Sequence, residues 1–493
     1  MSHALIQALQ DPALFDHPVT GFAVIETHIS WVLLTGPFAY KIKKPVNLGF
    51  CDFTSLEKRK FFCEEELRLN RRLAPELYAG VVPITGMESA PRLGGAGAAI
   101  EYAVKMVEFD QSCRLDRVLS SGRLEAGQID QLARELAEFH ASIPAAAPEA
   151  SYGRPEAVIQ AVRGTLAHCE SSGLAGWCEA EARHLEPVFE ARKASGFVRE
   201  AHGDVHLANV AVVDGRVRIF DAIDFNPELR WIDVMSEIAF AVMDLEDRGR
   251  SDLAFRLLNA YLEGTGDYEG LRVFRFYEVY RALVRAKVAA IRLSQPDLPE
   301  TDREEIRREA DGYLGLARRF TRTNPPGLMI THGISGSGKT YGTQKILEEE
   351  GCIRLRTDVE RKRLFGLKAD EPSPPSQRAE VYGPDATRRV YRKLLDLSWM
   401  ILGAGFSVIV DGTFLRRGER DEFRALAESL AVPFTILVFE ATEEVLKERV
   451  ASRKDEGRDA SEADWDVVAK QREWRQPLAA DEWPSARRTS PIT

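Results

Sequence analysis

The sequence has no long hydrophobic run, no closely paired cysteines and no excess of positive charge, and each absence excludes a class of protein. No apolar run approaches the roughly 18 residues that a membrane-spanning helix requires, so no membrane partner is expected. The six cysteines form no Cys-x-x-Cys pair and no group with histidine, which argues against zinc sites and disulfides. The formal net charge of −10 argues against extended nucleic-acid binding through a basic face.

A secretion signal is also missing, because the first 18 residues contain no basic stretch followed by an apolar one. We therefore expect a cytoplasmic location. The composition, 44% hydrophobic and 29% charged, is typical of a soluble globular protein. At 493 residues the chain is too long for one ordinary hydrophobic core and fits two or three domains.

The clearest domain boundary is the turn-rich segment Arg-Thr-Asn-Pro-Pro-Gly at 322–327, which follows a long charged helical pattern. Charge differs on its two sides. Residues 326–493 hold 27 of the 66 Lys and Arg and 28 of the 76 Asp and Glu, so the acidity lies almost entirely in the first segment. We expect a first domain at 1–322 and a second at 327–493.

The second domain begins with a complete phosphate-binding loop between a strand-like run at 328–331 and a helix-like run at 341–350. Closely spaced glycines let backbone N–H groups point at the α/β-phosphates of a nucleotide. Lys339 would reach the β/γ-oxygens, and Thr340 offers a hydroxyl to Mg²⁺. The nucleotide-binding residues expected here are Gly333, Ile334, Ser335, Gly336, Ser337, Gly338, Lys339 and Thr340.

Strand-like runs at 328–331, 352–357, 407–410 and 434–439 alternate with helical patterns, which predicts a parallel sheet between helices. Ligands of such sheets bind at the carboxyl ends of the strands, where Asp411 and Asp358 fall. Asp411 would hold Mg²⁺.

Asp358 and Arg361 lie three residues apart, so a base and a guanidinium group could address one acceptor hydroxyl. The structural alternatives are a helix N-cap for Asp358 and a solvated position for Arg361. Arg449 and Arg453 share one face of a helical pattern at 443–454 and could neutralise the transferring phosphoryl group. Exposed surface charge is the alternative for both arginines.

These residues make the second domain resemble the polynucleotide kinase and zeta-toxin branch of P-loop kinases over nearly all of its length. The resemblance rests on the phosphate loop, on residues 356–362, on Val-Asp-Gly-Thr at 410–413, and on Arg449 with Arg453. It implies that Asp358 activates the acceptor hydroxyl, that Arg361 binds the acceptor, and that the arginines belong to a lid. It implies phosphoryl transfer from ATP, and the missing Asn-Lys-x-Asp motif argues against a GTPase.

The first domain contains a second constellation, His-Gly-Asp at 202–204 followed by Asn209 and Asp221. A protein-kinase-type site needs an aspartate near the acceptor hydroxyl, an asparagine five residues later for metal, and a second metal-holding aspartate after the next hairpin. Asp204, Asn209 and Asp221 fit these positions in order. Asp224 is the rival for the last one.

Such a site also needs a strand lysine for the phosphates and a helix glutamate to pair with it. The pattern Phe-Ala-Tyr-Lys at 38–41 favours Lys41, although Lys43 lies on the same strand face. In the helical pattern that follows, the apolar positions favour Glu66 over Glu65 as the inward partner.

The first domain thus resembles the aminoglycoside phosphotransferase-like branch of the protein kinase fold, over about residues 20–320. The resemblance implies a small lobe at about 1–109, a hinge near 106–109 and a helical lobe at about 110–322. Two departures from the kinase pattern are that no glycine-rich loop precedes Lys41 and that Ala-Ile follows Asp221. His202 and His206 are expected to shape the catalytic loop, and Asp233 either braces that loop or caps a helix.

The predicted fold class is therefore mixed α/β and α+β, a two-lobed kinase-like domain followed by a P-loop domain. The predicted function is a bifunctional phosphotransferase that uses ATP and Mg²⁺ to phosphorylate a hydroxyl of a small-molecule or nucleotide-like acceptor. The alternative is an ATP-binding regulatory switch whose first domain binds a ligand without catalysis.

Overall fold

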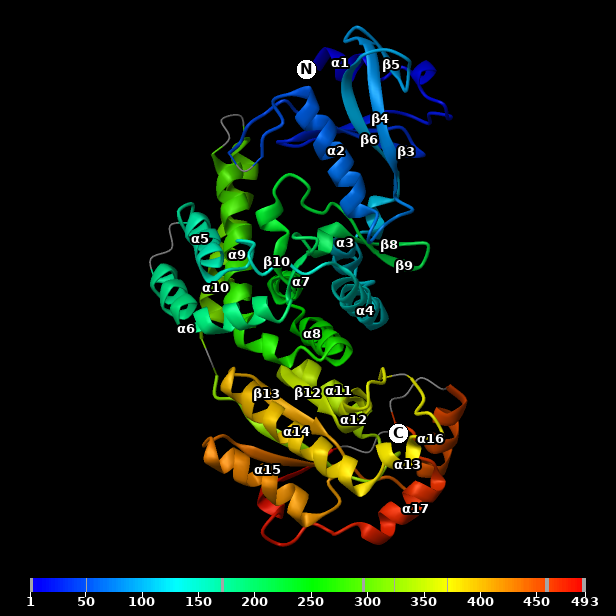
Figure 1. Ribbon diagram of the computed structural model, residues 1–493, viewed down its shortest axis with the longest axis vertical. Coiled ribbons are helices and arrows are strands. Elements are labelled where there is room, and N and C mark those ends of the chain that lie inside the picture. The colour runs from blue at the N-terminus through cyan, green and yellow to red at the C-terminus, as the bar shows by residue number, and fades with distance from the viewer. Residues whose placement is uncertain are drawn as a thin grey trace. The chain divides into compact units, whose positions relative to one another are not determined.

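The computed structural model describes residues 3–49, 51–169, 173–294, 298–322, 324–369, 371–456 and 461–489, with the side chains of 452–456 outside the description. They form two compact units (Figure 1). The first unit is Met1–Val162 with Glu186–Asp244, and the second is Arg163–Leu185 with Leu245–Thr493. The division between the units differs from the predicted boundary at 322–327, and helix α8 (Ser251–Thr265), which precedes this boundary, packs against strand β12 (Cys352–Arg356) of the P-loop sheet.

The first unit contains a six-stranded antiparallel sheet in the order β1-β2-β3-β6-β4-β5. Successive side chains of a strand point to opposite faces, and both faces are covered. Ala103 packs against helix α1 (His3–Ala8) on one face, and Val104 packs against helix α2 (Leu56–Asn70) on the other. The strands are β1 Ala23–Glu26, β2 Ser30–Leu34, β3 Phe38–Lys43, β4 Tyr78–Met87, β5 Ala90–Leu93 and β6 Ala99–Val107.

The rest of the first unit is mainly helical and carries the predicted catalytic loop. A hairpin of β8 (Val210–Val213) and β9 (Arg216–Ile219) follows this loop. It turns at Asp214 and Gly215, whose φ angles of 50° and 73° are those of a type I′ turn. The other elements are α3 Leu115–Ser120, α4 Ala126–Ser142, β7 Val198–Glu200, β10 Trp231–Asp233 and α7 Val234–Asp247; α5 Pro155–Leu166 and α6 Leu174–Ala194 extend into both units.

The second unit contains a five-stranded parallel sheet in the order β12-β13-β11-β14-β15 between helices. The four predicted strands are confirmed as β11 Leu328–His332, β12 Cys352–Arg356, β13 Ser407–Asp411 and β14 Phe434–Val438. The fifth, β15 Ala486–Arg488, was not predicted, because three residues give no readable alternation. The helices are α8 Ser251–Thr265, α9 Leu271–Leu293, α10 Glu300–Phe320, α11 Lys339–Glu350, α12 Thr357–Leu364, α13 Arg378–Val381, α14 Pro384–Gly403, α15 Arg417–Ser429, α16 Glu443–Glu456 and α17 Trp465–Trp474.

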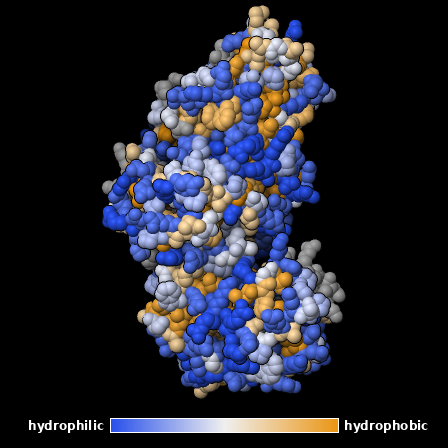
Figure 2. Space-filling model, in the orientation of Figure 1, coloured by the Kyte–Doolittle hydropathy of each residue, from blue (hydrophilic) through white to orange (hydrophobic). Residues whose placement is uncertain are grey.

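Polar side chains dominate the visible face in the space-filling view, and hydrophobic residues occur there in small patches (Figure 2). The largest exposed apolar side chains belong to different elements, such as Met87 in β4, Tyr341 in α11 and Trp399 in α14. Exposed apolar residues scattered in this way are normal for a protein surface. Within the described residues, every helix is either too short or too polar to cross a membrane.

Candidate active sites

The phosphate loop connects the carboxyl end of β11 to α11, which begins at Lys339. Gly336 and Gly338 have φ angles of 85° and 91°, in the left-handed region that favours glycine. At Gly333 an added Cβ would lie 2.6 Å from the carbonyl oxygen of Phe439, so no larger residue fits without a shift. The glycines therefore allow the loop to place its N–H groups at a helix N-terminus, where phosphate binds favourably.

The sheet brings together Thr340 of the phosphate loop and Asp411 at the end of β13, the two predicted magnesium ligands of this site. Strands β11 and β13 are parallel neighbours, so their carboxyl ends meet at one edge. Thr340 Oγ1 donates a hydrogen bond to Asp411 Oδ2 at 2.8 Å, and Lys339 Nζ donates to the Ile334 carbonyl at 2.9 Å. A hydroxyl beside a carboxylate fits Mg²⁺, which takes oxygen ligands and usually keeps several waters.

The predicted acceptor residues line the same cavity, which has a volume of about 1860 Å³. Asp358 is the second residue of α12 and the N-cap is Arg356, so the N-cap alternative for Asp358 is wrong. Arg361 is 7% exposed and donates to the carbonyl of Val381 at 3.2 Å, so the solvated alternative is also wrong. Its Nε is buried and has no hydrogen-bond partner among the described residues.

Helices α16 and α17 contribute the side chains that lie over the phosphate loop. Arg449 is half-buried, lines the cavity and donates to the Gly336 carbonyl at 3.4 Å. Arg453 belongs to α16, but its side chain lies outside the described residues. The loop contact that sequence reasoning missed is Gln471 of α17, whose side-chain oxygen accepts a hydrogen bond from the Ser335 N–H at 2.8 Å. An isolated glutamine in a polar helix gives no signal that would have revealed it.

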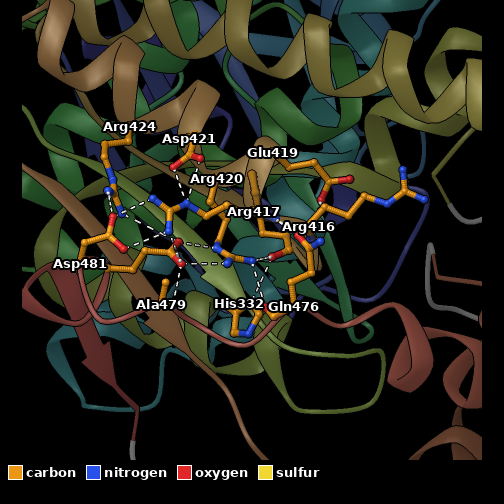
Figure 3. A network of polar contacts seen from close by, with 12 residues as sticks. His332, Arg416, Arg417, Glu419, Arg420, Asp421, Arg424, Gln476, Ala479 and Asp481 are labelled. Carbon is orange, nitrogen blue, oxygen red and sulfur yellow. Dashed lines mark hydrogen bonds and ion pairs between the residues drawn. The ribbon is translucent and has the colours of Figure 1, made fainter.

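A buried ion pair anchors the segment that follows α17 (Figure 3). The side chains of Arg420 and Glu482 are fully buried and meet through two contacts of 2.6 and 2.9 Å. Arg420 also donates to the carbonyls of Phe414 and Gln476, at 3.0 and 3.3 Å. Burial lowers the pKa of the neighbouring His332 to about 4, so this imidazole is neutral at pH 7. The network fixes one wall of the cavity, because Gln476 lines it.

In the first unit, two neighbouring lysines of β3 share one buried glutamate of α2. Lys41 Nζ lies 2.9 Å from Glu66 Oε1 and 2.7 Å from Asp221 Oδ1. Lys43 Nζ lies 2.7 Å from Glu66 Oε2 and 2.6 Å from Asp224 Oδ2. Lys41 thus contacts both Glu66 and Asp221, the other favoured residue. Lys43 and Asp224, the alternatives to these two, form a more buried pair, in which Lys43 contacts the same glutamate. Glu65 is not the inward partner, because it pairs with Arg68 and Arg230.

Charge within this cluster is set by burial and by the lysines. Burial opposes ionisation of Glu66, but the charges of Lys41 and Lys43 outweigh it and lower the pKa of Glu66 to about 2. Burial raises the pKa of Asp224 to about 6. The side chain of Asp221 is 49% exposed, against 6% for Asp224, so Asp221 is the more accessible carboxylate for a bound metal.

The predicted catalytic loop brings Asp204 and Asn209 into direct contact. Asn209 Nδ2 donates to Asp204 Oδ2 at 2.9 Å, so the amide oxygen of Asn209 is the atom that would hold Mg²⁺. His206 Nε2 lies 3.4 Å from the same carboxylate. His202 Nε2 contacts the Phe220 carbonyl at 2.9 Å, which links the loop to the strand before Asp221. Burial lowers the pKa of His202, so its imidazole acts as a neutral hydrogen-bonding group at pH 7.

The carboxylate that braces this loop is Glu237, which sequence reasoning missed. Its Oε1 accepts from the N–H groups of His202 and Gly203 at 2.9 and 2.6 Å, and its Oε2 contacts His140 Nε2 at 2.8 Å. Asp233 instead pairs with Arg192 and accepts a hydrogen bond from the Met235 N–H at the start of α7, so of its two predicted roles the helix cap fits the structure and the loop brace does not. Carboxylates inside the apolar α7 pattern were the available signal, because buried charges are rare unless paired.

Two protein-family models match this chain, each over a different range of residues. Residues 63–277 match the phosphotransferase enzyme family, and residues 328–478 match an AAA domain. The uncharacterized protein Rv2004c of Mycobacterium tuberculosis is 31% identical over 479 residues, covering 92% of this chain and 93% of its own. The uncharacterized protein Mb2027c of Mycobacterium bovis gives the same values.

Solved structures are similar to part of the chain. A choline/ethanolamine kinase family protein from Mesorhizobium loti covers 65% of this chain and 94% of its own, at 14% identity and a TM-score of 0.40. A gluconokinase from Sinorhizobium meliloti covers 34% of this chain and 85% of its own, at 19% identity and a TM-score of 0.25.

Proposed function

Because the chain belongs to the family of the mycobacterial protein Rv2004c and joins a phosphotransferase-type domain to a P-loop kinase-type domain, we propose that it is an ATP-dependent phosphotransferase. It transfers the γ-phosphoryl group of ATP to a hydroxyl of a small-molecule or nucleotide-like acceptor. Both domains bind ATP, so the protein is bifunctional.

One observation carries this proposal: the phosphate loop, the Thr340–Asp411 pair, Asp358 and Arg361 all line a single cavity of about 1860 Å³. A nucleotide with its phosphates on the loop would present the γ-phosphoryl group toward the rest of that cavity. Mg²⁺, held by Thr340 and Asp411, would neutralise charge on the phosphates.

The chemical step assigns one role to each remaining side chain. Asp358 takes the proton of the acceptor hydroxyl while the acceptor oxygen attacks the γ-phosphorus and the bond to ADP breaks. Arg361 holds the acceptor. Lys339 and the α16 arginines, Arg449 and Arg453, neutralise the charge that develops on the transferred group.

The first unit supports a second phosphotransfer site of the protein-kinase type. Lys41, anchored by Glu66, would bind the phosphates of ATP, and Asn209 and Asp221 would hold Mg²⁺. Asp204 then accepts the proton of a second acceptor. Glu237 holds the loop that carries Asp204 in place.

The proposal is tested with γ-labelled ATP and a pool of cell-extract metabolites. We expect the intact chain to label at least one metabolite, and Lys339→Ala to abolish a labelled product. Lys345→Ala is the matched control, because Lys345 lies on the same helix with a side chain 70% exposed. An intact chain that hydrolyses ATP and labels nothing would contradict the proposal.

One observation favours the alternative of a regulatory switch for the first unit. The β1–β2 hairpin, where protein kinases carry a glycine-rich loop, turns through Thr27, His28 and Ile29 and contains no glycine. In the switch, the first unit binds a ligand without catalysis, so Asp204→Asn would leave every labelled product unchanged. Loss of a product in that variant supports the second catalytic site.

A further inference from the structure

Helix α8 lies along the edge of the P-loop sheet, within the second unit. Strand β12 is an edge strand of that sheet, and edge strands present unpaired backbone groups. Asn259 of α8 is 2% exposed and satisfies two of them: its Nδ2 donates to the Cys352 carbonyl at 2.9 Å, and its Oδ1 accepts from the Arg354 N–H at 2.7 Å. One side chain therefore substitutes for a neighbouring strand at this position.

Packing contacts extend this attachment toward the start of α8. Arg256 Nη1 donates to Glu348 Oε1 of α11 at 2.7 Å. The ring of Phe255 lies so close to Gly351 that an added Cβ there would be 2.9 Å from it. Helix α8 precedes the predicted boundary at 322–327, yet it is built into the edge of the P-loop fold.

Glu263, one helical turn after Asn259, holds two arginines of β12. Its Oε1 accepts from Arg354 Nε and Nη2 at 3.0 and 2.9 Å, and its Oε2 lies 3.5 Å from Arg356 Nη1. Both arginines line the cavity of the P-loop site. Burial opposes ionisation of Glu263, but the two arginines lower its pKa, so it is charged at pH 7.

Arg354 continues this chain of contacts to the predicted magnesium site. It is 5% exposed, and its Nη1 donates to the Thr340 carbonyl at 3.1 Å. The hydroxyl of the same threonine contacts Asp411. If Glu263 were removed, the buried guanidinium group of Arg354 would lose its paired carboxylate. A buried charge that has lost its partner is strongly unfavourable, so the side chain moves or water enters.

We propose that Glu263 is a positioning residue of the P-loop site, acting through Arg354 on Thr340. The first turn of α11 is thus held from two sides, by Asp411 of the sheet and by a helix that precedes the predicted boundary. The inference rests on the proposed function only in that the phosphate loop binds a magnesium nucleotide.

The test uses the full-length chain and the non-hydrolysable analogue AMP-PNP. Binding is measured by calorimetry against Mg²⁺ concentration, and the part lost in Lys339→Ala is assigned to the P-loop site. We expect Glu263→Gln to raise the Mg²⁺ concentration for half-maximal binding about tenfold, the scale of one charged hydrogen bond. Glu269→Gln, at an exposed position of the same segment, should leave it unchanged.

A double-mutant cycle separates positioning from a general loss of stability. If Glu263 acts through Arg354, the double variant Glu263→Gln with Arg354→Gln should bind no more weakly than Arg354→Gln alone. Additive losses, or a Glu263→Gln variant that binds normally, would overturn the inference. If Glu263→Gln fails to fold, the Arg354→Gln variant alone tests the inference. An unchanged Mg²⁺ dependence of binding in Arg354→Gln would show that Arg354 does not link Glu263 to Thr340. Binding that Lys339→Ala does not reduce would instead contradict the proposed function.

Discussion

We expect Glu278 of α9 to make the stability of the protein depend on pH. Its side chain is buried, and burial raises its pKa from 4.5 to about 8 despite the nearby charge of Arg275. Between these values the folded protein holds the proton and the unfolded chain does not. Unfolding therefore releases a proton, and stability falls as pH rises from about 4.5 to about 8.

The magnitude follows from the linkage relation. Each pH unit in this window costs up to about 1.4 kcal/mol, so the interval from pH 6 to 7.5 costs about 2 kcal/mol. For a unit of this size the corresponding fall in Tm is about 4 °C. Glu278→Gln mimics the protonated acid and should remove this part of the pH dependence.

Thermal unfolding of the full-length chain at pH 6 and pH 7.5 measures the effect. Glu304→Gln, at an exposed position of α10, controls for the loss of one carboxylate. The wild type and this control should lose about 4 °C more between the two pH values than Glu278→Gln does. An equal loss in all three proteins would contradict this prediction and show that Glu278 titrates normally or is solvated.

Two further predictions concern buried carboxylates. Glu482→Gln leaves the fully buried Arg420 without its counter-charge and should destabilise the second unit by about 3–5 kcal/mol, measured as a fall in Tm. The control variant Glu473→Gln, at an exposed position, should change Tm little. Equal falls in Tm for the two variants would count against a stabilising role of the buried pair. Glu237→Gln should accelerate hydrogen exchange of the Gly203 amide about tenfold, because the Gly203 N–H loses a charged acceptor. An unchanged exchange rate would show that Glu237 does not brace the loop.

The phosphate loop and the sheet were readable from the sequence because their signals are local. A glycine-rich turn between an apolar run and a helical run determines strand, loop and helix together. Asp411 and Thr340 lie 71 residues apart, but the rule that ligands bind at the carboxyl ends of parallel strands predicts that they meet.

Features that depend on tertiary packing were not readable. The alternation of β3 places Lys41 and Lys43 on one face, so only the position of α2 shows that both reach Glu66. The attachment of α8 to β12 was missed for the same reason. Asn259 and Glu263 occupy ordinary polar positions of a helical pattern, and their partners lie more than 90 residues away.

In the proposed function, the P-loop cavity transfers phosphate to an acceptor hydroxyl with Asp358 as the base. The most direct test is the initial rate at which label from γ-labelled ATP enters the metabolite that Lys339→Ala fails to label. We predict that Asp358→Asn lowers this rate by about 10²- to 10⁴-fold, while Asp396→Asn, at an exposed position of α14, leaves it unchanged. An Asp358→Asn variant that transfers phosphate at the rate of the intact chain would show that Asp358 is not the base.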